Sequence, residues 1–396
     1  MRNVLFIFFF LLIEGCGFRS AETQSVSGIH GSRHHTCAIA AGGKLYCWGY
    51  NELGELGNGT DTDSSVPVKA SVLTGEVSAV AVGIAHTCVL IDSDPYCFGY
   101  NDWGSLGNGT TEDSSLPVSP TDLKSKSTSA IATRGFTTCA INEGALYCWG
   151  RNNVGQLGNN TLTDEFSPIV PQGLSSGVTA ISVGRDHTCA IQDGALFCWG
   201  MNTYGQLGDE TITTKKIPTA VTGLSSGVTA VAAGGYHTCA IVNSGLKCWG
   251  KNLFGELGNG TKENSSTPVD VTGMSAGVTA ISTGEGHACA IQNGKVYCWG
   301  YNGVGQVGDG TTTDATTPTL VQDLATGVTA VHAAGYHTCA VNGADIYCWG
   351  YNAEGQLGIG TAVSSTKPIY VLLTTNSTAF PLLWWASLER WTRALF

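Results

Sequence analysis

The segment GVTAISVGRDHTCAIQDGALFCWGMNTYGQLGDETITTKKIPTAV, residues 177–221, contains the patterns that decide the fold. VTAIS, HTCAI and ALFCWG are short apolar or alternating runs separated by glycine-rich stretches, which predict β-strands. Helical periodicity is absent from residues 25–371. Cys189 and Cys198 are symmetric about Asp193-Gly194, which favours a type I′ hairpin turn. Counting outward from the turn places the two cysteines opposite each other at a non-hydrogen-bonded pair, about 4.5 Å apart between Cα atoms.

This unit occurs seven times, in copies that start at residues 25, 76, 127, 177, 227, 277 and 327. Fourteen of the 15 cysteines form seven pairs at the equivalent positions. The pairs are Cys37 with Cys47, Cys88 with Cys97, Cys139 with Cys148, Cys189 with Cys198, Cys239 with Cys248, Cys289 with Cys298, and Cys339 with Cys348. Their spacing differs from that of a zinc knuckle, and we expect seven disulfides, each within one unit.

A proline follows the second cysteine of every unit by 20 residues, at Pro67, Pro117, Pro168, Pro218, Pro268, Pro318 and Pro368. Because proline has no N–H to donate, its fixed place predicts a fourth strand at the edge of each sheet. Seven four-stranded antiparallel sheets predict an all-β, seven-bladed propeller, which closes a ring. An open solenoid is the alternative, but it needs polar capping repeats, and neither the first nor the last unit is of that kind.

The two ends of the chain lie outside the repeats. Residues 1–15 combine Arg2 with an apolar run that is short for a membrane span, as in a signal peptide, and residues 16–24 form a short linker. Gly15 followed by Cys16 resembles the bacterial lipoprotein signal, which implies lipidation of Cys16 and anchoring at the outer membrane or cell surface. An ordinary secretory signal with an incidental cysteine is the alternative. Residues 372–396 form an apolar tail rich in tryptophan, whose role the sequence does not indicate.

The repeated residues also resemble a known family. Gly-x-x-His-Thr-Cys-Ala-Ile followed by Cys-Trp-Gly-x-Asn-x-x-Gly-Gln-Leu-Gly is similar to the regulator of chromosome condensation repeat over residues 25–371. The resemblance implies a seven-bladed propeller that works as a protein-binding platform. The paired cysteines depart from the eukaryotic form and resemble the exported bacterial branch. The founding member acts on the nuclear GTPase Ran, so an exported protein is not expected to share its nucleotide-exchange activity.

Two recurring aromatic positions have structural explanations. We expect the histidines of one register, with Thr137 in the remaining copy, to be buried and hydrogen-bonded within their own blades rather than to bind metal. These histidines are His35, His86, His187, His237, His287 and His337. The tryptophans after the second cysteines, with Phe98 in one copy, are expected to pack the blades. These tryptophans are Trp48, Trp149, Trp199, Trp249, Trp299 and Trp349.

Positions that differ between copies are the candidates for binding, because tyrosine, tryptophan, arginine and methionine are enriched at binding hot spots. Two loop positions after each Cys-Trp-Gly, or Cys-Phe-Gly in the second copy, supply the predicted partner-binding residues Tyr50, Tyr100, Trp103, Arg151, Met201, Tyr204, Lys251, Phe254, Tyr301 and Tyr351. A loop before the histidine register adds Arg33, Phe136, Arg185, Tyr236 and Tyr336. The sequence alone does not place these loops on one face.

Composition and motifs narrow the function. A net charge of −11 disfavours nucleic acid and anionic lipid headgroups as partners. No catalytic motif or inserted loop interrupts the repeats, so we expect neither an enzyme nor a cofactor. The expected function is an exported, lipid-anchored, monomeric protein-binding platform. The alternatives are an envelope protein that binds polysaccharide and an inhibitor of an extracellular enzyme.

Overall fold

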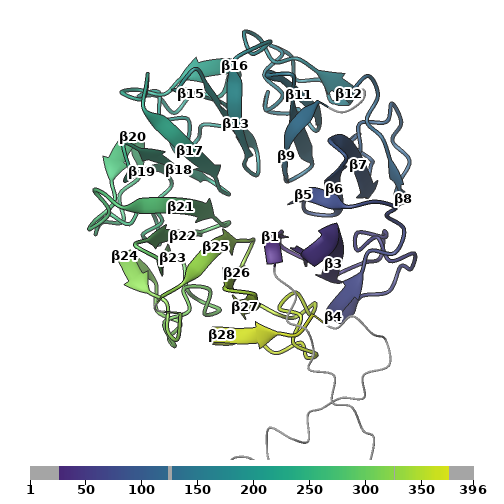
Figure 1. The fold of residues 1–396 in the computed structure, drawn as a ribbon. Helices are drawn as coiled ribbons and strands as arrows, with labels where there is room; N and C mark the ends of the chain where they lie inside the picture. Colours follow the sequence, from purple (N-terminus) through teal and green to yellow (C-terminus); the bar gives the residue numbers. More distant parts are fainter. Residues whose placement is uncertain (1–25, 124–126, 325, 374–396) are drawn as a thin grey trace, which may run out of the picture. The chain divides into compact units, whose positions relative to one another are not determined.

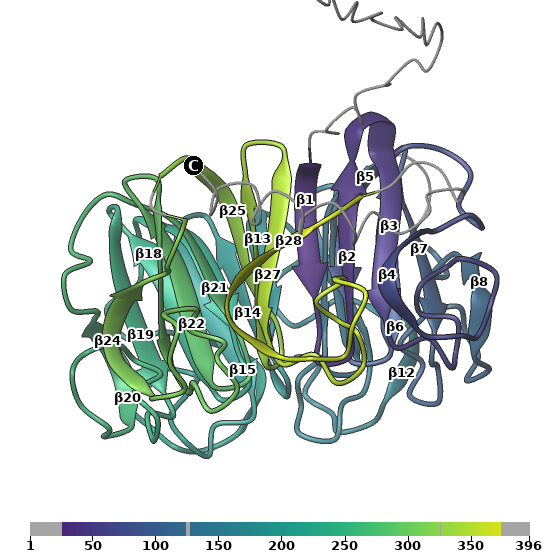
Figure 2. The same ribbon diagram turned by 90° about the horizontal axis from the view of Figure 1, so that it is seen from below.

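The computed structural model describes residues 26–123, 127–324 and 326–373, and these residues form a ring of seven blades (Figure 1). Each blade is a four-stranded antiparallel sheet whose strand order follows the chain, which confirms the predicted propeller. Turned by 90°, Figure 2 shows the strands running between the two faces of the ring. The predicted signal, the linker and the tail from residue 374 lie outside the described residues.

The first three blades are formed by strands β1 to β12. Blade 1 consists of β1 (Val26–Gly31), β2 (His35–Ala40), β3 (Lys44–Gly49) and β4 (Ser64–Lys69), with a short 3₁₀ turn, Ala41–Gly43. Blade 2 consists of β5 (Val77–Val82), β6 (His86–Ile91), β7 (Asp94–Gly99) and β8 (Ser114–Val118). Blade 3 consists of β9 (Thr128–Arg134), β10 (Thr137–Asn142), β11 (Ala145–Gly150) and β12 (Glu165–Ile169).

The other four blades repeat this plan with nearly constant strand lengths. Blade 4 consists of β13 (Val178–Val183), β14 (His187–Gln192), β15 (Ala195–Gly200) and β16 (Lys215–Ala220). Blade 5 consists of β17 (Val228–Ala233), β18 (His237–Val242), β19 (Gly245–Gly250) and β20 (Ser265–Asp270). Blade 6 consists of β21 (Val278–Thr283), β22 (His287–Gln292), β23 (Lys295–Gly300) and β24 (Ala315–Leu320), and blade 7 of β25 (Val328–Ala333), β26 (His337–Asn342), β27 (Asp345–Gly350) and β28 (Ser365–Val371).

The hairpin between the second and third strands forms as the sequence predicts. Asp193 and Gly194 both have positive φ, 51° and 80°, as a type I′ turn requires. The seven prolines lie in the fourth strands of the blades, β4, β8, β12, β16, β20, β24 and β28. The register between the third and fourth strands shifts there, as between Cys47 and Gly49 in blade 1.

All seven cysteine pairs form disulfides within their blades, as predicted. The two cysteines of each pair lie directly opposite each other on the second and third strands, with Cα atoms 4.1 Å apart. That separation is slightly shorter than the expected 4.5 Å of a non-hydrogen-bonded pair. The bridges join Cys37 to Cys47, Cys88 to Cys97, Cys139 to Cys148, Cys189 to Cys198, Cys239 to Cys248, Cys289 to Cys298, and Cys339 to Cys348.

The blades meet at seams, and the six tryptophans that follow the second cysteines are fully buried there; we call them the seam tryptophans. Trp48 of blade 1 packs with Val341 and Ile346 of blade 7, and its Nε1–H donates to the Gln356 carbonyl at 2.8 Å. The other five tryptophans donate in the same way to the preceding blade. The tryptophans therefore pack between blades and also satisfy buried carbonyls there.

The histidine prediction is correct on burial, but it missed the partner that recurs in most blades. His35 Nδ1 does lie 3.3 Å from Ser32 Oγ of its own blade, while its Nε2 lies 2.8 Å from Thr87 Oγ1 of the next blade. The same contact recurs at four other seams, between blades 2 and 3, 4 and 5, 6 and 7, and 7 and 1. The last of these, between His337 and Thr36 at 2.7 Å, closes the ring. The strand after each such seam offers its threonine hydroxyl where the neighbouring imidazole ends, so the bond joins blades. Burial lowers the pKa of His35 to about 3, which keeps this imidazole neutral.

One histidine lacks this partner because the sequence changes at its seam. In blade 6 the threonine is replaced by Ala288, and among the described residues neither buried ring nitrogen of His237 has a hydrogen-bond partner. Ala288→Thr should therefore raise the free energy of unfolding by about 1 kcal/mol, the usual contribution of one hydrogen bond. Urea unfolding measures the change. Thr338→Ala is the matched control, because it removes the equivalent hydrogen bond to His287 at the next seam and should lower the free energy of unfolding. An Ala288→Thr protein no more stable than wild type would contradict this account.

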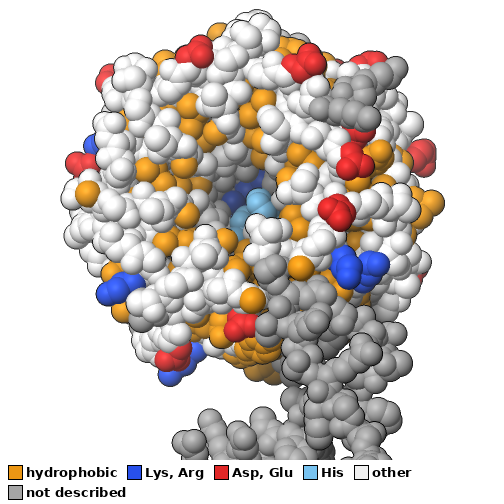
Figure 3. Space-filling model, in the orientation of Figure 1, with side chains coloured by type: hydrophobic (Ala, Val, Ile, Leu, Met, Phe, Trp, Pro, Cys, Tyr) orange, Lys and Arg blue, Asp and Glu red, His pale blue; other side chains and the backbone are white. Residues whose placement is uncertain are grey.

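The centre of the ring is a channel lined by the innermost strands, β1, β5, β9, β13, β17, β21 and β25. Figure 3 looks into this hollow, where basic and histidine side chains are visible; the lining includes Arg134, His30 and His332. The Arg134 guanidinium reaches across the channel from blade 3 and donates to the carbonyls of Thr283 at 2.5 Å and Ala334 at 3.3 Å. It thus ties blade 3 to blades 6 and 7.

Arg134 occupies the position that is glycine in four other blades, three residues before the histidine register. A Cβ on Gly83 would collide with the imidazole of His86. In blades 1 and 7 the residues here are serine and alanine, so nothing larger than serine stands beside a histidine. Blade 3 has the smaller Thr137 in place of histidine, which leaves room for the arginine. Blade 3 therefore departs from the other blades at both positions together, because Arg134 fits only where Thr137 replaces the histidine.

Candidate functional site

The variable loops lie on one face of the ring. In each blade the loop after the third strand hydrogen-bonds to the loop between the first and second strands. Examples are Tyr50 N to the His34 carbonyl at 3.1 Å and Tyr351 N to the Tyr336 carbonyl at 3.0 Å. The three sets of variable positions found in the sequence therefore share this face, which we call the loop face.

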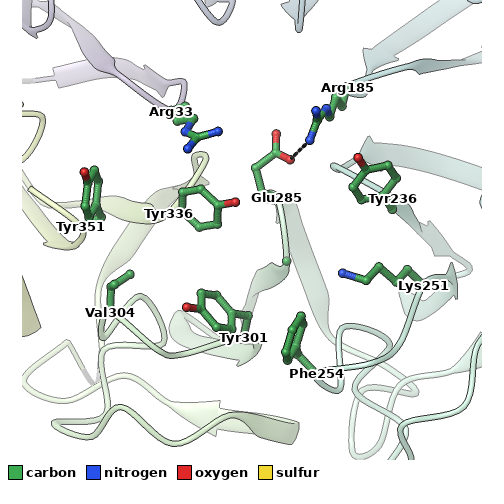
Figure 4. A pocket seen from close by; sticks show the side chains of 11 residues that line it. Arg33, Arg185, Tyr236, Lys251, Phe254, Glu285, Tyr301, Val304, Tyr336 and Tyr351 are labelled. Atoms are coloured by element: carbon green, nitrogen blue, oxygen red, sulfur yellow. Dashed lines mark ion pairs between the residues drawn. The ribbon is translucent and has the colours of Figure 1, made fainter.

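A pocket of about 470 Å³ opens on the loop face over blades 5 to 7. Figure 4 shows its side chains, with Glu285 near the centre and aromatic rings around it. The lining side chains come from five blades and are Arg33, Arg185, Tyr236, Lys251, Phe254, Glu285, Tyr301, Val304, Tyr336 and Tyr351. Of the ten residues that the sequence analysis assigns to partner binding, four line it: Lys251, Phe254, Tyr301 and Tyr351.

The cations of the pocket lie against aromatic rings. The Lys251 ammonium is 4.8 Å from the centre of the Phe254 ring and 5.8 Å from that of Tyr236. The Arg33 guanidinium lies 5.3 Å from the centre of the Tyr336 ring. Such contacts hold long, charged side chains in place at a surface and leave their N–H groups available.

Two carboxylates balance part of this charge. Arg185 lies 3.6 Å from Glu285 across the pocket, and Lys251 lies 3.6 Å from Glu256, which is fully buried beneath the loop. Burial raises the pKa of Glu256, and hydrogen bonds from backbone N–H groups and the Lys251 charge oppose that rise. Lys251 therefore both faces the pocket and compensates a buried acid.

The corresponding carboxyl in blade 1, Glu55, has no cation within ion-pair distance in the described part of the chain. Burial raises its pKa from 4.5 to about 7. The folded state keeps this proton while the unfolded chain loses it, so stability should fall as the pH rises from 4.5 to 7. Glu55→Gln should abolish about 2 to 3 kcal/mol of this pH-dependent decrease in the free energy of unfolding. Glutamine should fit at this position, because four blades already have it there.

Urea unfolding of wild type and Glu55→Gln at about pH 5 and pH 8 tests the prediction, because only the ionisable side chain contributes this slope. The two proteins should differ little in acid, and the variant should be the more stable at the higher pH. Parallel pH profiles would show that Glu55 titrates normally in the folded state.

The other predicted binding residues occupy the rest of the loop face. Trp103 is 36% exposed and lies under the Arg151 guanidinium, 5.3 Å from ring centre to Cζ. Tyr204 meets the edge of Tyr236 at 5.5 Å between ring centres, so it supports the pocket wall. Met201 follows β15 and is half-buried. The hydroxyls of the remaining two, Tyr50 and Tyr100, donate to carboxylates within their own loops.

The sequence analysis missed Glu285 as a pocket residue. It stands two residues before His287, in the same register as Arg33 and Arg185, which were both noted. Glu285 is the acidic residue in a set otherwise made of arginine, glycine and isoleucine, so a comparison position by position would have found it.

The described residues contain neither a cluster of metal-ligating side chains nor a membrane-spanning helix. No group of three or more His, Cys, Asp or Glu side chains is arranged to hold a metal ion within residues 26–123, 127–324 and 326–373. Over the same residues, no helix has the length and apolar character needed to cross a membrane.

Comparison with known proteins gives matches in sequence to one family. Residues 74–380 match the RCC1-like domain, and residues 42–90 match the regulator of chromosome condensation (RCC1) repeat. The ultraviolet-B receptor UVR8 of Arabidopsis thaliana is 33% identical over 138 residues, which are 34% of this chain and 31% of the receptor. The human probable E3 ubiquitin-protein ligase HERC4 is 31% identical over 159 residues, 38% of this chain and 15% of the ligase. The chain thus spans less than a third of either relative.

Solved structures share the fold at low identity. Human WBSCR16 superposes with a TM-score of 0.73 and 20% identity, over 83% of this chain and 94% of that protein. Yeast RCC1 (Prp20), solved with Kap60 bound, gives a TM-score of 0.75 and 22% identity, over 89% of this chain and 84% of the yeast protein. Since the family match covers more than half of its residues, the chain belongs to the RCC1-like domain family.

Proposed function

We propose that this protein is a non-catalytic platform that binds a protein partner through the loop face. The observation that carries the proposal is the pocket itself, which gathers aromatic and basic side chains from five blades at one place. Tyrosine and arginine are enriched at protein-binding hot spots, and a concave centre surrounded by further loops suits a protein surface. Yeast RCC1, which shares the fold, has been solved with Kap60 bound, a precedent for a protein partner.

A polysaccharide-binding role is the second candidate. It would be favoured by similar aromatic clefts repeated from blade to blade, because a sugar chain repeats. Instead, the loop residues at and beside the pocket differ between blades: the fourth residue after the glycine that ends the third strand is Phe254 in blade 5, Val304 in blade 6 and Glu354 in blade 7. This variation favours one protein surface.

The test is capture of partners from an envelope and medium extract with residues 17–396, followed by binding measurements with the purified partner. The variant Phe254→Ala/Tyr301→Ala/Tyr351→Ala changes the pocket, and Leu116→Ala/Ile212→Ala/Val363→Ala changes exposed apolar residues elsewhere. We expect the pocket variant to lose at least about tenfold in affinity, as loss of one hot spot does, and the control to bind like wild type. Equal binding by both variants would exclude the pocket, and retention of polysaccharide alone would favour the second candidate.

Export and lipid anchoring complete the proposal and rest on residues 1–16. If Cys16 is lipidated, labelled palmitate should be incorporated into the wild-type protein and not into Cys16→Ala. A wild-type protein that takes up no label, and is released to the medium, would indicate an ordinary secretory signal. We further propose that the ring acts as a monomer and without nucleotide-exchange activity.

A further inference from the structure

The polar groups of the pocket are mostly hydrogen-bond donors. Three cations, Arg33, Arg185 and Lys251, line it against one carboxylate, Glu285, although the chain as a whole carries a charge of −11. Glu285 is already paired with Arg185 at 3.6 Å. Arg185 also lies 3.6 Å from Asp186, and Lys251 lies 3.6 Å from the buried Glu256, so Arg33 is the pocket cation that no carboxylate pairs with among the described residues. The uncompensated charge that the pocket presents to a ligand is therefore positive.

Arg33 is the cation with the greatest capacity for a new partner. It is exposed, and no carboxylate lies within 4.0 Å of its guanidinium among the described residues. Its contact with the Tyr336 ring fixes the guanidinium at the pocket rim without using its N–H donors. A guanidinium held in this way can form a bidentate pair with an incoming carboxylate.

The tyrosines give an internal comparison between the two halves of the loop face. In blades 1 and 2 the Tyr50 and Tyr100 hydroxyls each donate to a carboxylate two residues later, Glu52 and Asp102, both at 2.8 Å.

In blades 6 and 7 the same register holds Tyr301 and Tyr351, but the residues two positions later are Gly303 and Ala353. No acceptor contacts either hydroxyl in the described part of the chain, so both can donate to a ligand. The internal acids are thus absent where the pocket lies.

We propose that the pocket binds an acidic segment of the partner protein, with its carboxylates paired to Arg33 and Lys251 and accepting from Tyr301 and Tyr351. This inference rests on the proposed function and names the chemistry of its partner. Carboxylates supply the acceptors that the blade 6 and 7 loops lack, and the rings of Phe254 and Tyr336 provide apolar walls for the methylene groups of glutamate. Anionic polysaccharide has similar charge but, as argued above, would be expected to use repeated clefts.

The experiment measures fluorescence anisotropy of a labelled hexaglutamate peptide with the full chain, and compares hexaglutamine and hexalysine. Hexaglutamate should bind, hexaglutamine should bind at least about tenfold more weakly, and added salt should weaken the complex because exposed charges are screened. Arg33→Gln/Tyr301→Phe/Tyr351→Phe should weaken binding by at least about tenfold. This variant breaks no hydrogen bond or ion pair of the described fold, so it should unfold like wild type.

Two matched controls separate the pocket from general charge effects. Tyr50→Phe/Tyr100→Phe removes the same hydroxyls from blades 1 and 2, and Lys44→Gln/Lys367→Gln removes exposed charge away from the pocket lining. Both should bind hexaglutamate like wild type.

The inference is overturned if hexaglutamate does not bind, if hexaglutamine binds equally, or if the pocket variant binds undiminished. Tighter binding of oligogalacturonate than of hexaglutamate would assign the pocket to anionic polysaccharide and also overturn it. If the captured partner still depends on the pocket while hexaglutamate fails to bind, the platform stands and the acidic segment is wrong. If the partner ignores the pocket, the proposed function itself fails.

Discussion

Refolding without its disulfides should leave the ring unfolded. Each bridge joins cysteines nine or ten residues apart, and closing such a loop in the unfolded chain contributes about 2.5 kcal/mol to stability. Seven bridges together then exceed the about 5–15 kcal/mol that holds an ordinary domain folded. The predicted loss is the largest that any treatment of this protein should produce.

Since the cysteines are fully buried, the protein must be reduced in denaturant and then diluted without oxidant. Tryptophan fluorescence and near-ultraviolet circular dichroism should show that the seam tryptophans remain exposed to water. The control is Cys189→Ala/Cys198→Ala, which should stay folded and lose only about 2.5 kcal/mol. A native spectrum and an unchanged urea midpoint for the fully reduced chain would show that the blades hold without their bridges.

Gly83→Ala should destabilise the ring by about 1 to 3 kcal/mol, although it adds a single methyl group. The added Cβ would collide with the His86 imidazole, which Thr138 and Thr133 hold at 2.9 and 2.8 Å. Blade 7 accommodates Ala334 beside His337, but that imidazole has only the Thr36 hydroxyl as a partner among the described residues. Blade 3 shows a second permitted combination, a larger residue at 134 with threonine at 137. His86→Thr should therefore rescue part of the damage.

A double-mutant cycle measures that rescue. His86→Thr alone should cost about 1 to 2 kcal/mol through its lost hydrogen bonds, and the double variant should be about 1 to 2 kcal/mol more stable than the two single costs predict. Gly28→Ala is the control, because its Cβ would meet only Ile39 Cδ1, at 3.6 Å. Strict additivity of Gly83→Ala and His86→Thr would refute the steric explanation.

Much of this fold could be predicted from the sequence, because its determinants are local. Strand alternation, the Asp193-Gly194 turn, the cysteine pairs and the edge proline each act within one unit of about 50 residues, and seven copies repeat the evidence. The hairpin register follows from the turn alone, so the spacing of the cysteines is enough to assign the disulfides.

Relations between blades could not be predicted in this way. The histidine's partner lies 51 or 52 residues away in the next blade, and its identity depends on the angle and spacing at which two sheets pack. The pocket is harder still, since it brings Arg33 near Tyr336 only after the ring has closed. The residue types of the variable loops predicted that these loops bind a partner, but they did not predict which loops come together to form the pocket.

Ring closure has a consequence for how the protein forms. Each described blade is a continuous stretch of chain, with no strand shared between the first and last blades, so strand pairing in the described residues joins strands that are neighbours in sequence. The seam between blades 7 and 1 instead joins distant parts of the chain, since its His337–Thr36 and Trp48–Gln356 bonds link residues 301 and 308 positions apart. Low contact order favours rapid growth blade by blade, and the joining of the two ends is then the slow kinetic step. A circular permutant that opens the ring at another seam should move that slow step to the new opening, and leave the rest of the assembly order unchanged.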